Sequence, residues 1–186
     1  MSAKFDFDLE INRKGTSSFK VDKLAERYGN ENLIPLWVAD MDFLSPPHIT
    51  EAIIERAKHG VFGYTYSTNE YYDSIINWVD RRHNWTVKKD WISFIPGVVK
   101  GIAFIIDCFT SENDGIIIQP PVYPPFNSIP SMHKRKVITN PLVLKDGRYE
   151  MDFEHLKKVI TSEKPKLFIL CNPHNPGGRV WTKEEL

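Results

Sequence analysis

The sequence predicts an α/β protein with a mainly parallel sheet and helices on both faces of that sheet. Three short apolar runs, at Ile116–Gln119, Lys136–Asn140 and Lys166–Leu170, have the length and composition of buried strands. Segments with helical periodicity separate these runs, and Asp114-Gly115 and Asp146-Gly147 supply turns. Strands that alternate with helices favour parallel pairing through right-handed crossovers.

The amino-terminal part is expected to contain helices and one buried strand. In order, we expect a helix at Asp22–Tyr28 that ends at Gly29, a buried strand at Leu36–Ala39, and helices at Pro46–Ala57 and Glu70–Arg82. Ser45 is the expected N-cap of the third element, because Pro46 and Pro47 suit a first helical turn, and Gly60 is the expected terminator.

The remaining elements lead into or connect the three predicted strands. We expect a strand at Trp91–Ile95, a turn at Pro96-Gly97, a helix at Val98–Phe109, a further helix after residues 120–125, and a helix from the Asp152 cap to Ile160. Because the Val98–Phe109 helix is nearly all apolar, Cys108 is interpreted as a small core residue.

Composition favours a small-molecule ligand. The 186 residues are 41% hydrophobic and 26% charged, with 24 basic and 24 acidic side chains, so no net field attracts nucleic acid or an anionic membrane. No signal-peptide core or membrane-spanning run is seen, and the cytoplasm is the expected location. The two cysteines and six histidines have no metal-ligand spacing.

The last five residues have the pattern of a helix start. Thr182 and Glu185 stand at capping-box spacing just before an apolar residue. A helix of this length cannot support itself, so we expect the sequence to be the amino-terminal part of a longer protein.

Three strand or loop junctions carry residues suited to one ligand. At Pro96–Gly101, free amides at a helix start could hold a phosphate, although an ordinary strand-to-helix turn is the competing interpretation. Tyr123, in a proline-rich loop, could stack on a flat ring, or it could be a simple loop or core tyrosine. Asn175 could bond a ring substituent, or it could only form the turn.

Together these junctions describe a flat heteroaromatic ring that carries a phosphate, and pyridoxal phosphate fits that description. Arg179 could bind a carboxylate, but a surface ion pair is the competing role.

The sequence resembles fold-type I pyridoxal-phosphate (PLP) enzymes of the class I/II aminotransferase family, and in particular their cystathionine and cysteine-conjugate β-lyase branch. Four blocks carry the resemblance: Trp37–Phe43 (WVADMDF), Gly60–Thr65 (GVFGYT), Pro96–Val99 (PGVV) and Cys171–Trp181 (CNPHNPGGRVW). It implies a three-layer α/β/α sandwich of the PLP-dependent transferase type. Residues 1–45 would belong to the small domain and arm, and residues 46–186 would begin the large PLP-binding domain.

The resemblance also implies roles for individual residues. The Val98 and Val99 amides would hold the cofactor phosphate, Tyr123 would stack on the pyridine ring, and Asn175 would bond its phenolic oxygen. Tyr64 would reach the phosphate of the partner in a homodimer, unless it is simply a core residue among Phe62 and Tyr66. Ala39 and Asp40 would border the substrate carboxylate.

The sequence departs from the family pattern in two mild ways and one serious way. Gly177 stands where threonine is frequent in the turn, and Lys100 stands where proline is common. The lysine that forms the Schiff base, the aspartate that pairs with the pyridine nitrogen and the substrate-binding arginine all follow the Asn-Pro turn in the family. No catalytic residue is therefore assigned, because this lysine would lie beyond Leu186, and no other lysine here sits in its motif.

By resemblance, the full-length protein would release thiol, pyruvate and ammonia from cystathionine or related cysteine conjugates. An aminotransferase is the competing enzyme, and the Trp37–Phe43 block together with Tyr123 favours the lyase. The 186 residues alone could be an inactive product that binds phosphate or pairs through its helices, and a phosphate-binding regulatory domain is a further alternative.

Overall fold

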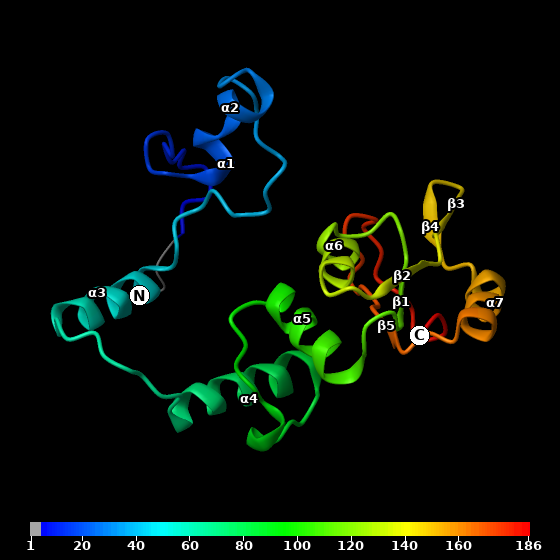
Figure 1. Cartoon of the computed structure of the whole chain (residues 1–186). Coiled ribbons are helices and arrows are strands. Elements are labelled where there is room, and N and C mark those ends of the chain that lie inside the picture. The colour runs from blue at the N-terminus through cyan, green and yellow to red at the C-terminus, as the bar shows by residue number, and fades with distance from the viewer. Residues whose placement is uncertain (1–4) are drawn as a thin grey trace. The chain divides into compact units, whose positions relative to one another are not determined.

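The computed structural model describes residues 5–186, which form two units (Figure 1). The first unit ends at Ser67 and the second runs from Thr68 to Leu186. The functional boundary expected after residue 45 stays a prediction.

Helices are the regular elements of the first unit in its described residues. They are α1 (Phe19–Asp22), α2 (Leu24–Tyr28) and α3 (Pro47–Lys58). The first predicted helix thus begins earlier than expected and is interrupted at Lys23, but it does end at Gly29, which adopts φ 71°. In α3 the N-cap is Pro46 rather than Ser45, and no side chain caps the helix.

The buried strand predicted at Leu36–Ala39 is wrong. This segment has no strand partner among the described residues, and Leu36 is 90% exposed. Trp37 packs instead on the short helices: its ring centroid lies 4.9 Å from that of Phe19 and 5.7 Å from that of Tyr28. An apolar run becomes a strand only where a neighbouring strand satisfies its backbone groups.

The second unit begins with α4 (Asn69–His83), the 3₁₀ turn η1 (Lys89–Trp91) and α5 (Val98–Phe109). The predicted bounds of α4 and α5 agree closely with these. The strand predicted at Trp91–Ile95 is wrong, because its first residue closes a 3₁₀ turn and the remaining residues have no strand partner among the described residues.

A parallel sheet forms the centre of the second unit and confirms the predicted α/β class. Its strands are β1 (Gly115–Ile118), β2 (Lys136–Thr139) and β5 (Leu167–Phe168), in the order β2-β1-β5. β1 pairs in parallel with both neighbours. The crossovers carry α6 (Pro125–Met132) and α7 (Phe153–Glu163), and Asp152 caps α7 as predicted, accepting a bond from the His155 amide at 2.9 Å.

The core lies on β1, which is buried along its whole length. Ile116 packs with Ile106 of α5 and Ile129 of α6 on one face of the sheet. Ile117 points to the opposite face by the alternation of a strand and is 1% exposed, so both faces of this strand are covered.

Cys108 does not belong to this core, and the prediction that it does is wrong, because it is exposed. The α5 sequence is apolar nearly all round, so its periodicity does not reveal which face is buried.

A small antiparallel hairpin between β2 and α7 was not predicted. Its strands are β3 (Val143–Lys145) and β4 (Arg148–Glu150). The turn expected at Asp146-Gly147 joins them, and both residues have positive φ (48° and 76°), as a two-residue hairpin loop requires.

The predicted capping box is present near Leu186. The Thr182 amide donates to Glu185 Oε2 at 2.7 Å, and the Glu185 amide donates to Thr182 Oγ1 at 3.3 Å. Two main-chain donors are thus satisfied reciprocally.

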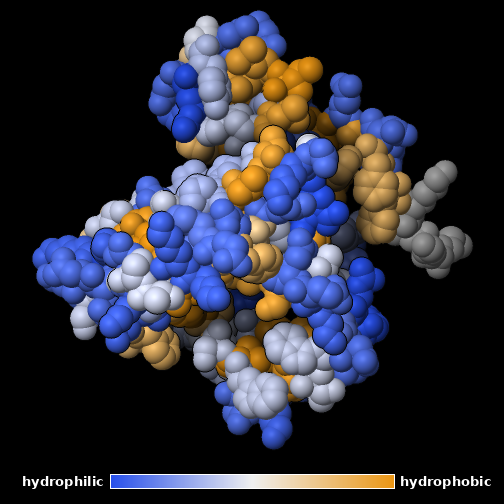
Figure 2. Space-filling model, turned by 90° about the vertical axis from the view of Figure 1, so that its right-hand side faces the viewer, coloured by the Kyte–Doolittle hydropathy of each residue, from blue (hydrophilic) through white to orange (hydrophobic). Residues whose placement is uncertain are grey.

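Apolar side chains are exposed in both units, and Figure 2 shows orange groups set between hydrophilic ones. On α5 these include Val98, Phe104 and Phe109, exposed by 79%, 54% and 72%. Over residues 5–186, no helix has both the length and the apolar character that crossing a membrane requires.

Candidate functional site

Two loops that carry predicted site residues leave the same edge of the parallel sheet. β1 and β5 are neighbours, and the Ile169 amide extends their pairing by donating to the Ile117 carbonyl at 2.9 Å. The chain that leaves β1 leads to Tyr123, and the chain that leaves β5 leads to Asn175. In an open α/β sheet, the carboxyl ends of the strands form the binding edge.

His174 joins the two loops. Its Nδ1 accepts a bond from the Gly177 amide at 3.3 Å, so in this tautomer Nε2 carries the hydrogen and donates to the Gln119 carbonyl at 3.4 Å. The imidazole is 3% exposed and meets the Trp181 ring edge-on, with centroids 5.7 Å apart. The residue before Asn175 is therefore fixed to the end of β1.

A buried polar chain continues along this edge. The Gln119 side-chain amide donates to Asn140 Oδ1 at 2.9 Å, and Asn140 Nδ2 donates to the Asp152 carbonyl at 3.1 Å. Asn140 is fully buried, and Gln119 is 2% exposed, with its Oε1 lacking a hydrogen-bond partner among the described residues. Buried amides with this many bonds fix the geometry of the strand ends.

The turn around Asn175 is held by its main chain. The Asn175 amide donates to Cys171 Sγ at 3.3 Å, and the Trp181 indole donates to the Cys171 carbonyl at 2.8 Å. The Trp181 amide donates to Asn172 Oδ1 at 3.1 Å. The Asn175 side chain is exposed and makes no hydrogen bond within residues 5–186, so it is free to meet a ligand.

Arg179 forms an ion pair, as its competing interpretation expected, but this pair is not at the surface; binding of a ligand carboxylate stays a prediction. Its guanidinium pairs with Glu185 and lies 4.6 Å from the Trp181 ring centroid. Arg179 is 5% exposed, so this is an ion pair, but a buried one that closes the turn rather than a surface contact.

The start of α5 offers main-chain donors. Gly97 is its N-cap with φ 106°, and no side chain caps the helix within the described residues. The Val98 and Val99 amides belong to the first turn, where amides have no intrahelical acceptor. A short turn joins α5 to β1, and Ile106 of α5 packs on Ile116 of β1, so α5 belongs to the same unit as the sheet (Figure 1).

Tyr123 is 38% exposed and is supported from one side. Its ring meets Phe126 edge-on, with centroids 6.0 Å apart and planes at 86°. Phe126 is buried and belongs to α6. The tyrosine ring is therefore anchored while part of it stays open to a ligand.

Ala39, Asp40 and Tyr64 lie in the first unit. The Asp40 carboxylate is bound by Arg13, with Nη2 to Oδ2 at 2.6 Å, and by Lys20, and these bonds hold the pKa of Asp40 below its usual value. Tyr64 is fully exposed and is not a core residue of its unit.

Sequence reasoning missed the residues that support the site. His174, Gln119 and Asn140 were not singled out, although a buried-strand run that ends in a polar residue is a signal for such a network. The partners of Asp40 gave no sequence signal, because Arg13 is 27 positions away. Among the residues that the structure describes, no group of three or more His, Cys, Asp or Glu side chains is placed to hold a metal ion.

The fold and this edge define the class of the protein. The family model "Aminotransferase class I and II" matches residues 31–186, and the chain belongs to this family. The family resemblance inferred from four sequence blocks is confirmed.

Individual relatives are similar to this chain over nearly its whole length. The chain is 45% identical over 181 residues to cystathionine beta-lyase PatB of Bacillus subtilis, which covers 97% of this chain and 47% of PatB. A PLP-bound putative aminotransferase from Clostridium difficile 630 is 43% identical, with a TM-score of 0.92 over 98% of this chain and 47% of that one. Cystalysin from Treponema denticola, whose structure contains pyridoxal 5'-phosphate, is 38% identical with a TM-score of 0.91, over 98% of this chain and 47% of cystalysin. The chain spans about half the length of the relatives it matches.

Proposed function

We propose that this chain supplies part of a PLP-dependent enzyme that cleaves the C–S bond of cystathionine or a related cysteine conjugate by β-elimination. The products are a thiol, pyruvate and ammonia, and the enzyme acts in the cytoplasm. The observation that carries the proposal is that the loops of Tyr123, whose ring is anchored, and Asn175, whose side chain has no partner in the described residues, leave neighbouring strands of one sheet. The uncapped start of α5 in the same unit supports it. The sequence identity of 45% to PatB, which is named a cystathionine beta-lyase, supports the choice of reaction.

The residues at this edge fit PLP. Uncapped amides at Val98 and Val99, behind a glycine with φ 106°, suit a phosphate at the positive end of a helix. The half-open ring of Tyr123 suits stacking on a pyridine. The side-chain amide of Asn175, without a partner in the described part of the chain, suits a bond to the ring's phenolic oxygen.

Bound PLP supplies an electron sink that makes the α-proton of an amino acid removable. The chain's own residues bind and orient. The α5 start holds one end of the cofactor, Tyr123 fixes the plane of its ring, and Asn175 fixes its rotation within that plane. Ala39 and Asp40 are proposed to border the carboxylate of the amino-acid substrate.

We further propose that the whole protein is a homodimer in which Tyr64 serves the partner's phosphate site. Full exposure of its phenol supports this role, because the hydroxyl is free to donate. Exposed apolar side chains on α5 also favour contact with another chain.

An aminotransferase is the second candidate, favoured by the Clostridium difficile relative named a putative aminotransferase. The two reactions share the cofactor and differ in their products. β-Elimination releases pyruvate from cystathionine without a second substrate, whereas transamination needs a keto acid and leaves the sulfur bond intact.

The test is the full-length protein, loaded with PLP and given L-cystathionine, with pyruvate followed by a coupled lactate dehydrogenase assay. Pyruvate release without added keto acid is expected; amino transfer that depends on a keto acid, with no pyruvate, would refute the lyase. Asn175→Ala should lower PLP affinity by about tenfold or more, because a hydrogen bond to a charged group contributes free energy equivalent to such a change in affinity. Asn127→Ala, at an exposed asparagine of α6, is the matched control and should leave affinity unchanged.

A further inference from the structure

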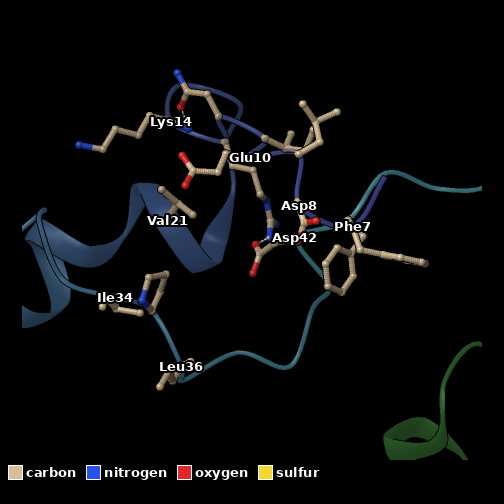
Figure 3. Close-up of a pocket in the computed structure, with 14 residues that line it drawn as sticks. Phe7, Asp8, Glu10, Lys14, Val21, Ile34, Leu36 and Asp42 are labelled. Atoms are coloured by element: carbon tan, nitrogen blue, oxygen red, sulfur yellow. Dashed lines mark hydrogen bonds and ion pairs between the residues drawn. The ribbon is translucent and has the colours of Figure 1, made fainter. Parts of the chain in front are cut away.

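Two basic and two acidic side chains of the first unit form one cluster. Arg13 bonds Asp40 (Nη2 to Oδ2, 2.6 Å) and Asp42 (Nη1 to Oδ1, 2.5 Å). Lys20, on α1, bonds Asp42 Oδ2 at 2.6 Å and the Asp40 carbonyl at 3.0 Å. Each cation thus bridges both aspartates. Arg13 and Asp42 also line a cavity of about 470 Å³, and Figure 3 shows a dashed bond at Asp42.

Lys20 is the most enclosed member of this cluster. It is 5% exposed, and its ammonium meets three oxygens, because Asp40 Oδ1 also lies 3.4 Å away. A buried cation is tolerated only where acceptors replace its water, so these contacts depend on one another. The Lys20 carbonyl also accepts the Trp37 indole N–H at 3.1 Å. The segment from Trp37 to Asp42 is therefore attached to α1 at both ends.

The cluster also occupies the side chain of Asp40. Both of its carboxylate oxygens accept bonds from Arg13, Oδ1 at 3.1 Å and Oδ2 at 2.6 Å. Two unpaired aspartates beside a substrate carboxylate would repel it. With two cations on two aspartates, the charges within this cluster are balanced, so its carboxylates do not oppose an anion at the Ala39–Asp40 main chain.

We propose that Arg13 and Lys20 are positioning residues that fix the Ala39–Asp40 main chain and neutralise its neighbouring carboxylates, so that this segment accepts the carboxylate of an amino-acid substrate. This inference rests on the proposed function, which gives Ala39 and Asp40 their place beside the substrate. Asp40 then acts through its main chain, and its side chain serves as an anchor.

The experiment compares two lysine variants of the full-length, PLP-loaded protein. Lys20→Met should raise KM for cystathionine by about tenfold or more, because the free energy of the lost bonds between charged groups corresponds to a change of this size. The kcat should stay within about threefold of the wild-type value. PLP affinity, measured by titration, should not change. Lys23→Met is the matched control, because Lys23 is exposed and pairs only with nearby Glu26 in the described residues; it should leave KM unchanged. An unchanged KM in folded Lys20→Met would overturn the proposal.

Two further measurements keep the test decisive. If Lys20→Met does not fold, Arg13→Met replaces it, because Arg13 is less enclosed, with 21% of its side chain exposed, and the same rise in KM is required. Amide hydrogen exchange over residues 37–42 should become faster in either variant, and equal rates would contradict the anchoring. This exchange result needs no catalysis, so a wild-type protein that releases no pyruvate refutes the proposed function without deciding whether the segment is anchored.

Discussion

Gly97→Ala tests whether the start of α5 is built for an anion. Gly97 has φ 106° and ψ 144°, close to a region that only glycine populates readily. A Cβ built on Gly97 meets no atom within 4 Å, so the substitution adds backbone strain and no clash. That strain is worth about 1–3 kcal/mol.

The strain should appear as lost cofactor affinity. In the free variant, residue 97 relaxes to negative φ and turns the Val98 and Val99 amides away from a common point. Binding must then restore the strained conformation, which costs up to about 1–3 kcal/mol and raises the PLP dissociation constant by about 5- to 150-fold. Titration of the full-length protein, followed by cofactor absorbance and tryptophan fluorescence, measures this change.

Gly101→Ala is the matched control on the same helix. Its added Cβ would lie 3.7 Å from the Ile95 side chain, which is ordinary contact, and alanine in a helix interior is favoured over glycine by about 0.5–1 kcal/mol. This variant should bind PLP as the wild type does and unfold at the same or a higher temperature. A folded Gly97→Ala protein with wild-type affinity would refute the anion-site reasoning.

Three other predictions concern stability. Ile106→Ala should cost about 2–5 kcal/mol in urea unfolding because Ile106 is fully buried, whereas Ile105→Ala, at a 45% exposed neighbour, should cost far less; equal costs would contradict the core assignment. Asn140→Ala should cost about 1–3 kcal/mol, measured in the same way, because it leaves a buried glutamine amide without its acceptor. The pKa values of Asp40 and Asp42 are lowered below 3.8 by their basic partners, so their stabilisation is present above pH 3.8 and is lost as pH falls through the lowered values. Thermal unfolding of Asp42→Asn should therefore depend less on pH in that acid range than unfolding of the wild type.

The helices were predictable because their signals are local. The bounds of α5 agree with the sequence prediction, and Asp152 caps α7 through a bond three residues away. Such contacts need no knowledge of the rest of the chain. The Asp146-Gly147 turn was found in the same way, although the hairpin around it required pairing that a single segment does not reveal.

The two wrong strands show the limit of local signals. Leu36–Ala39 and Trp91–Ile95 have strand-like composition, but the structure gives neither one a strand partner within residues 5–186. By contrast, the predicted strand Ile116–Gln119 corresponds to β1, which lies between two partner strands and begins and ends one residue earlier than predicted. A strand depends on a neighbour that composition does not identify.

The candidate site was half predictable for the same reason. Parallel strands place their carboxyl ends at one edge, so the loops of Tyr123 and Asn175 could be brought together from sequence alone. The contact that fixes them, from His174 to the Gln119 carbonyl, spans 55 positions and follows from the fold.

The Asn175 turn combines an ordered main chain with a side chain that has no internal partner in the described residues, and this combination favours ligand binding. Cys171 and His174 fix the main chain on either side, and Trp181 packs against the imidazole, while the Asn175 side chain keeps no internal partner in the described residues. A ligand that bonds this amide therefore meets a donor whose backbone is already ordered, and only side-chain rotation is lost on binding. The same amide on a mobile loop would lose backbone freedom as well, at about 1–2 kcal/mol for each residue ordered, so the buried imidazole beneath the turn contributes to affinity without touching the ligand.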